Sequence, residues 1–120
     1  MKLNSILFGI LVFFMISCKN ESIGQTGPND IKKQIEKDPG IMVDVRTLDE
    51  WNSGHHPRAI HADWENGDFV KQSKSWDTSK TYYLYCAAGG RSSQATEHLK
   101  KNGYKKVINL GGYDAVKNLK

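Results

Sequence analysis

Cysteine is scarce in this chain, which has only Cys18 and Cys86 among its 120 residues. A small exported domain that is held together by disulfides needs several paired cysteines, so this class of scaffold is excluded. Metal ligands are equally sparse. His55, His56 and His61 lie close together in the sequence, but a Pro-containing loop offers no defined ligand face, and no Cys or Glu completes a set. We expect neither a metal nor another cofactor.

Long apolar runs and a strong excess of one charge are also missing. The apolar run at residues 6–16 is well short of the roughly 20 residues that span a bilayer. With 17 basic and 13 acidic residues, the formal net charge is +4. Lysines scattered among acidic residues indicate a solvated face, so a nucleic-acid partner is not expected. A chain of this length leaves room for a single domain.

The N-terminal segment has the pattern of an export signal. Lys2 precedes the apolar run and Ser17 and Cys18 follow it, and this order is typical of a secretory signal. The Ser17-Cys18 pair resembles the lipobox of bacterial lipoproteins, in which the cysteine is lipidated and becomes the new N-terminus. We expect a signal peptide over residues 1–17 and an exported protein, held by a lipid on Cys18 at a membrane of the cell envelope or periplasm. Ordinary cleavage and a retained membrane anchor remain alternatives.

Residues 18–28 are polar and contain Gly and Pro, which predicts a flexible tether and leaves residues 29–120 as the folded domain. In that domain, segments typical of strands alternate with segments typical of helices. This order predicts an α/β fold with a central, mainly parallel sheet flanked by helices on both faces. The predicted strands are 41–45 and 81–86, which are rich in β-branched and aromatic residues respectively, and 59–61 and 106–110. Helices are expected from a cap at Asn29-Asp30 to Pro39-Gly40, from a capping box between Thr47 and Glu50, within 63–75, from Ser92 or Ser93 to Lys101 with Gly103 closing it, and after Gly112.

Cys86 ends a predicted strand and starts a loop of small residues that leads into a helix. Ligands of open α/β sheets bind at this carboxyl edge. Small residues let the backbone curl so that its amides converge on an anion, and the next helix adds the positive end of its dipole. Together with Arg91, these features favour the nucleophilic thiolate. A buried structural cysteine is the alternative reading.

Four segments that together extend across nearly all of residues 29–119 resemble motifs of the rhodanese family and follow one another in the family's order. No single segment is specific, but their order and register together carry the resemblance. They are an Asp-x-Arg strand with a Glu-Trp helix (43–46 and 50–51), a Gly-His-x-Pro-like segment (54–60), a Cys-x-x-Gly-x-Arg-Ser strand and loop (83–92), and a closing Gly-Gly turn (107–113).

The resemblance implies a sulfurtransferase that works in two steps. Cys86 takes sulfur from a small donor such as thiosulfate and becomes a persulfide, and an external thiol or cyanide then removes that sulfur. The exposed site of so small a domain also leaves room for a protein partner. Cys86 and Arg91 are the implied catalytic residues. The implied donor-binding residues of the loop are Ala87, Ala88, Gly89, Gly90 and Ser92.

Asp44 and Arg46 match positions that lie beside the site in the family. We expect them to support the loop, through a charged pair or through hydrogen bonds to its backbone. A plain structural salt bridge is an equal alternative.

Two other functional classes remain open. Phosphatases and arsenate reductases of the related fold surround a tetrahedral oxyanion with a Cys-x5-Arg loop, and the loop from Cys86 to Arg91 is one residue shorter. A non-catalytic binding or sensing module is the other class, and the intact Cys86 and Arg91 disfavour it. Some thiosulfate-specific relatives carry a cation where this chain has Ala87, which leaves Arg91 as the charged side chain of the loop.

Overall fold

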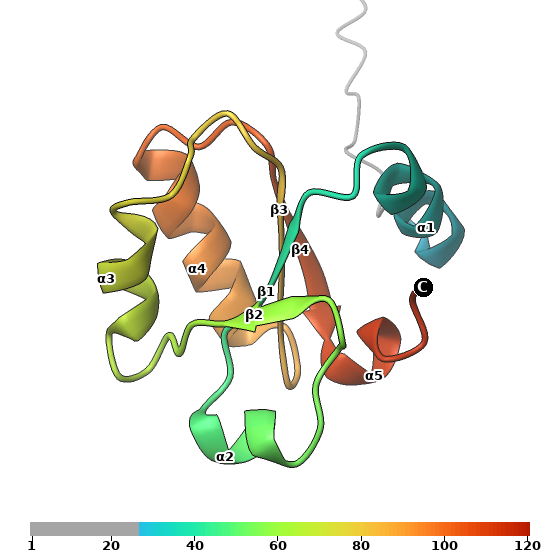
Figure 1. The fold of residues 1–120 in the computed structure, drawn as a ribbon, viewed down its shortest axis with the longest axis horizontal. Coiled ribbons are helices and arrows are strands. Elements are labelled where there is room, and N and C mark those ends of the chain that lie inside the picture. The colour runs from blue at the N-terminus through green and yellow to red at the C-terminus, as the bar shows by residue number, and fades with distance from the viewer. Residues whose placement is uncertain (1–26) are drawn as a thin grey trace, which may run out of the picture.

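The structure, a computed structural model, describes residues 27–120; the predicted signal peptide, Cys18 and most of the predicted tether lie outside the described residues. Four strands form one parallel sheet in the order β2-β1-β3-β4 (Figure 1). Among residues 27–120, no helix combines the length and the apolar character needed to cross a membrane. The elements are α1 (Pro28–Lys37), β1 (Ile41–Asp44), α2 (Leu48–Asn52), β2 (Ala59–His61), α3 (Asp68–Ser73), β3 (Tyr82–Cys86), α4 (Gly90–Lys101), β4 (Val107–Gly112) and α5 (Tyr113–Val116).

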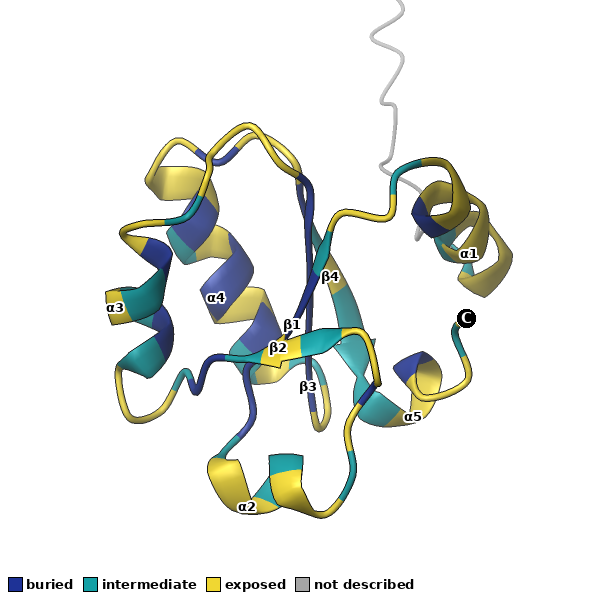
Figure 2. Cartoon of the chain, in the orientation of Figure 1, coloured by how far each residue is buried: buried dark blue, intermediate teal, exposed yellow. Residues whose placement is uncertain are grey.

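Helices cover both faces of the sheet, with α3 and α4 on one side and α1 and α5 on the other, which confirms the predicted α/β class (Figure 1). The central strand β3 is buried along its whole length (Figure 2). Successive side chains of a strand point to opposite faces. Leu84 and Cys86 therefore belong to the core under α3 and α4, whereas Tyr83 and Tyr85 belong to the core on the other face.

Local sequence signals account for most of these elements. The Thr47 hydroxyl accepts the amide of Glu50, and the Glu50 carboxylate accepts the amide of Thr47, so the predicted capping box starts α2. β-branched and aromatic residues form β1 and β3, as expected. Gly103, with a φ of +88°, lies just beyond the end of α4. These predictions are confirmed.

Several element boundaries differ from the prediction, among them the start of α1 and the end of β4. α1 begins at Pro28 behind Gly27 and not at an Asn29-Asp30 cap, because proline has no amide proton to satisfy and suits the first helical turn. β4 continues to Gly112, where it pairs with Cys86 beyond an irregularity in the register. The second difference matters for the site, because it brings the Gly-Gly turn against the loop that follows Cys86.

Candidate active site

Cys86 is the last residue of β3 and lies at the carboxyl edge of the sheet, where the chain turns into α4 (Figure 1). The residue is 1% exposed and belongs to the core between the sheet and α4. α2 follows the parallel neighbour β1 and lies at the same end of the sheet (Figure 1). The topology thus brings residues of α2 to the loop after Cys86, although they are far apart in the sequence.

The loop after Cys86 curls so that its backbone meets the sulfur. Gly89 adopts a φ of +97°, a left-handed conformation that favours glycine, and its amide donates to Cys86 Sγ at 2.9 Å. The same turn leads directly into α4 at Gly90, so the prediction that Ser92 or Ser93 caps this helix is wrong. With Gly89 as the cap, Ser92 lies inside the first helical turn and is buried.

The Ser92 hydroxyl connects the sulfur to the neighbouring strand. Its Oγ lies 3.3 Å from Cys86 Sγ, 3.1 Å from the Gly89 carbonyl oxygen and 2.7 Å from Asn109 Oδ1 on β4. The Gly111 amide donates to the same Oδ1 at 2.9 Å, which identifies this atom as the acceptor facing Ser92. Asn109 is a site residue that sequence reasoning missed, because a single asparagine in a predicted strand carries no signal of its own.

The surroundings of Cys86 favour its thiolate. Burial of the sulfur raises the pKa of the thiol, but hydrogen bonds from the Ser92 side chain and from nearby backbone amides outweigh burial and lower the pKa of Cys86 overall. The amides are those of Ser92, Ala88 and Gly89. Because the thiolate is the reacting form of cysteine, a lowered pKa increases the nucleophile available at neutral pH.

Arg91 lies at the site and is paired with a carboxylate of α2. Its Nη1 lies 2.7 Å from Glu50 Oε1, and its Nη2 lies 3.0 Å from Glu50 Oε2. Nη1 also lies 3.9 Å from a carboxylate oxygen of Glu65. The hydrogen bonds from Arg91 lower the pKa of Glu50 to about 2, so this carboxylate is ionised at neutral pH. Sequence reasoning placed Glu50 in a helix cap but missed its ion pair with Arg91.

Asp44 and Arg46 form a charged pair, but this pair braces a different segment from the expected one. Arg46 Nη2 donates to Asp44 Oδ2 at 2.7 Å and to the carbonyl oxygen of Gly54 at 2.7 Å. The guanidinium carbon of Arg46 lies 4.4 Å from the centroid of the Tyr113 ring. Within residues 27–120, neither side chain hydrogen-bonds to the loop at 86–91. The pair therefore holds the α2–β2 connection near α5, which agrees with the alternative of a structural salt bridge and not with support of the loop.

The end of β4 forms the floor of the loop. A Cβ atom on Gly112 would lie 2.6 Å from the carbonyl oxygen of Ala87, a distance that only glycine avoids at this position. Ala87, Ala88 and Gly90 are exposed on the outer side of the loop. The loop is thus supported from within by the Gly-Gly turn and is open to solvent outside.

Comparison with known proteins agrees with this geometry. The family model of the rhodanese-like domain matches residues 27–119. This chain belongs to the rhodanese-like domain family. YrkF of Bacillus subtilis, named as a sulfur carrier protein, is 30% identical over 90 residues, which are 74% of this chain and 48% of YrkF. The chain therefore spans about half the length of that relative.

Two further relatives carry different names. YtwF of Bacillus subtilis, named as a sulfurtransferase, is 32% identical over 83 residues, which are 68% of this chain and 79% of YtwF. A tRNA uridine(34) hydroxylase of Staphylococcus aureus is 30% identical over 89 residues, which are 71% of this chain and 28% of the hydroxylase. The rhodanese-like domain is thus shared by proteins with distinct named roles.

Solved structures show the same fold. A rhodanese-like domain protein from Staphylococcus aureus superposes with a TM-score of 0.62 at 32% identity, covering 73% of this chain and 85% of that one. A rhodanese from E. coli, described as containing anions, superposes with a TM-score of 0.57 at 30% identity, covering 62% of this chain and 88% of the other.

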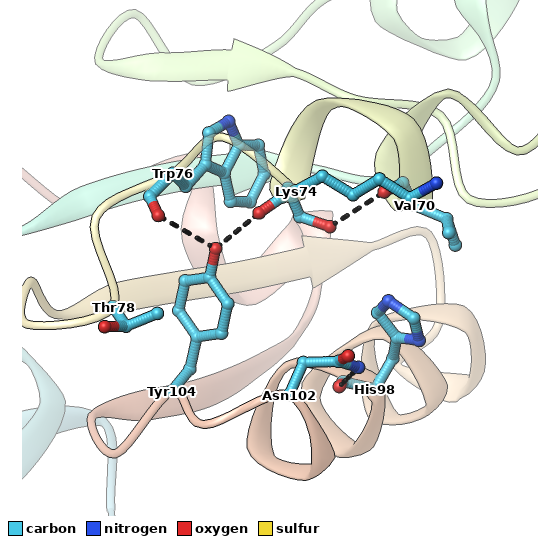
Figure 3. Close-up of a pocket in the computed structure, with 8 residues that line it drawn as sticks. Val70, Lys74, Trp76, Thr78, His98, Asn102 and Tyr104 are labelled. Atoms are coloured by element: carbon cyan, nitrogen blue, oxygen red, sulfur yellow. Dashed lines mark hydrogen bonds between the residues drawn. The ribbon is translucent and has the colours of Figure 1, made fainter.

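A pocket of about 270 Å³ in the rhodanese-like domain lies away from Cys86, between α3 and the C-terminal half of α4 (Figure 3). Its lining includes Trp76, His98 and Tyr104. The Tyr104 hydroxyl donates to the carbonyl oxygens of Ser73 and Trp76, so this polar group is used within the fold. At 1.5 Å per residue, His98 lies on the order of 12 Å along α4 from the loop. The pocket is separate from the Cys86 site.

The neighbouring histidines of the rhodanese-like domain have separate contacts. The His55 ring stacks on the Trp51 ring, with the ring centroids 3.4 Å apart. His56 Nε2 lies 2.7 Å from the carbonyl oxygen of Leu119, and His61 Nε2 lies 2.7 Å from that of Arg46. Among residues 27–120, no group of three His, Cys, Asp or Glu side chains is placed to hold a metal ion.

Proposed function

We propose that this rhodanese-like domain is a sulfurtransferase that carries sulfur as a persulfide on Cys86. One observation carries the proposal: a buried sulfur at the end of β3 accepts the Gly89 amide at 2.9 Å and has a lowered thiol pKa. An amide that stabilises a thiolate also stabilises the anionic sulfur of a persulfide. The relatives named as a sulfur carrier and a sulfurtransferase support this function.

The transfer has two half-reactions. In the first, the Cys86 thiolate attacks the outer sulfur of the donor. With thiosulfate, a new S–S bond forms, the S–S bond of thiosulfate breaks, and sulfite leaves with the bonding electrons. In the second, an acceptor thiolate attacks the outer sulfur of the Cys86 persulfide, and Cys86 leaves as a thiolate. Cys86 is the only free cysteine among residues 27–120, and the other cysteine of the chain, Cys18, is the proposed site of lipid attachment, so the proposal takes the acceptor thiol from another molecule.

The test is the intact mass of the purified protein before and after thiosulfate, and again after cyanide. We expect the gain of one sulfur atom, its removal by cyanide, and no gain in Cys86→Ser, whose fold is checked by circular dichroism. A gain with mercaptopyruvate or a polysulfide but not with thiosulfate would keep the mechanism and change the donor. No gain with any of these donors would favour a non-catalytic binding module.

We also propose that the protein is exported and anchored by a lipid on Cys18. The support is the order of charge, apolar run, small residue and cysteine over residues 2–18. We expect Cys18→Ala to move the protein from the membrane fraction to the soluble fraction. Retention of that variant in the membrane would instead favour an uncleaved apolar anchor.

A further inference from the structure

Two carboxylates surround the cation of the Cys86 loop. Glu50 binds Arg91 through both oxygens, at 2.7 and 3.0 Å, and Glu65 lies 3.9 Å from the same guanidinium. The side chains of Arg91, Glu50 and Glu65 are 21%, 32% and 56% exposed, so the cluster lies at the solvent side of the site. Together these three side chains carry one positive and two negative charges.

Glu50 is held in place by its own helix as well as by Arg91. The Thr47 hydroxyl donates to Glu50 Oε1 at 3.0 Å, and the Thr47 amide approaches the same oxygen at 3.3 Å. The carboxylate is therefore fixed opposite the guanidinium. The second arginine near this edge, Arg46, is buried and paired with Asp44, and adds no net charge. The excess of negative charge at the site is thus built into the fold.

Backbone and side chains meet different parts of a sulfur donor. The Gly89 amide donates to Cys86 Sγ, so it is close to the point where the transferred sulfur attaches. Arg91 directly precedes Ser92, whose Oγ lies 3.3 Å from Cys86 Sγ, so the part of a donor that projects from the loop would lie in the field of Arg91 and its two carboxylates. In thiosulfate that part is a negatively charged sulfonate, which like charges repel. In an organic persulfide it is an R–S group, which carries no charge until it leaves as a thiolate.

We propose that Glu50 is a specificity-determining residue that directs this site toward uncharged or cation-bearing organic persulfides and against the thiosulfate dianion. The proposal rests on the persulfide chemistry of Cys86 proposed above.

The transfer from such a donor balances without another reactant. The Cys86 thiolate attacks the outer sulfur of R–S–SH, a new S–S bond forms, and the S–S bond of the donor breaks. R–S⁻ leaves with the bonding electrons and takes a proton from water, and Cys86 carries the –S–SH group.

The test compares kcat/KM for thiosulfate with kcat/KM for 2-hydroxyethyl persulfide, whose organic group carries no charge. Glu50→Gln keeps the oxygen that Thr47 and Arg91 contact but removes the negative charge. We expect the thiosulfate-to-persulfide ratio to rise about tenfold in Glu50→Gln. A smaller rise is expected in Glu65→Gln, whose carboxylate is farther from Arg91 and more exposed. Glu36→Gln, an exposed change of the same charge on α1, is the matched control and should leave the ratio unchanged.

Salt supplies a second readout on the unmodified protein. Because ions screen exposed charges over about 10 Å at 0.1 M, higher ionic strength should raise the ratio of the wild type more than that of Glu50→Gln. An unchanged ratio in Glu50→Gln and Glu65→Gln, with no salt effect, would overturn the role of Glu50. Failure of the wild type to gain sulfur from either donor would instead overturn the sulfurtransferase function itself.

Discussion

The Ser92 hydroxyl has one proton and three acceptors within reach. Asn109 Oδ1 is the nearest at 2.7 Å, followed by the Gly89 carbonyl at 3.1 Å and Cys86 Sγ at 3.3 Å. While Cys86 is a thiol, its S–H can donate to Ser92 Oγ, and the Ser92 hydroxyl can donate its own proton to Asn109 Oδ1. When Cys86 ionises, rotation of the hydroxyl brings the same proton to the sulfur. A single side chain thus serves both protonation states of the nucleophile.

The Ser92 hydroxyl stabilises the thiolate form of Cys86. Ser92→Ala removes a hydrogen bond to the thiolate, so the pKa of Cys86 should rise and the thiolate should be less populated at neutral pH. A hydrogen bond to a charged group contributes about 1.5 kcal/mol, which corresponds to about tenfold slower alkylation by iodoacetamide at pH 7. The pH dependence of the alkylation rate measures the change. Ser93→Ala, exposed one residue further along α4, is the control, and equal rates in both variants would contradict the role of Ser92.

At the scale of elements, the loop after β3 depends on the end of β4. The register shift between Leu84 and Tyr85 lets β4 place Gly112 beside Cys86. Gly112 has an ordinary φ of −90°, so any residue could adopt its backbone conformation. Glycine is needed there because the Ala87 carbonyl would lie 2.6 Å from a Cβ atom. The requirement is therefore one of space rather than of backbone strain.

Gly112→Ala should push the loop away from β4 and misplace the amides around the sulfur. We expect the rate of sulfur loading to fall by about tenfold or more, since small displacements of catalytic groups have large effects. Overpacking of this kind costs about 1–3 kcal/mol of unfolding free energy, which urea denaturation measures. Gly27→Ala, where the nearest atom to the new Cβ lies 3.7 Å away, is the control. A wild-type rate of sulfur loading in Gly112→Ala would show that the loop does not depend on its close contact with Gly112.

At the scale of the whole molecule, ion pairs join elements that the chain keeps far apart. Glu50 on α2 and Arg91 on α4 are separated by 41 positions and meet through two hydrogen bonds. Arg46, at the end of β1, reaches the Gly54 carbonyl beyond α2 and the Tyr113 ring on α5. These contacts tie the short helix α2, none of whose residues is buried, to the rest of the fold.

The Glu50–Arg91 pair makes the stability of the molecule depend on pH. The pKa of Glu50 is lowered from 4.5 to about 2 in the folded state, so its contribution is present above about pH 4.5 and is lost as the pH falls toward 2. Because the pair is partly exposed, we expect a contribution of about 1 kcal/mol. Urea unfolding at pH 6 and pH 3 should show a larger loss of stability in the wild type than in Glu50→Gln. Equal losses would contradict this linkage.

The order of strands and helices, the parallel α/β class and the place of Cys86 at a strand end could be predicted from the sequence alone. These features depend on local physics: buried strands need apolar β-formers, helices need caps, and parallel strands need crossovers. The capping box at Thr47 could be read directly, because its two partners are three residues apart. The start of α4 could not be predicted in this way. Whether a serine or a left-handed Gly89 caps this helix depends on the path of the loop, and β4 sets that path from a distant part of the sequence.

The side chains that surround the sulfur, and the charge that they carry together, could not be predicted, because they come together only in the fold. Asn109 reaches Ser92 because β4 lies beside β3, and Glu50 neutralises Arg91 because α2 and the start of α4 meet at one edge of the sheet. Support of the loop and a structural salt bridge were equal alternatives for Asp44 and Arg46, and the fold uses the pair to brace the α2–β2 connection. The physical reason is common to all three cases: hydrogen bonds and ion pairs act over about 3–4 Å, and the fold alone sets which distant residues come that close.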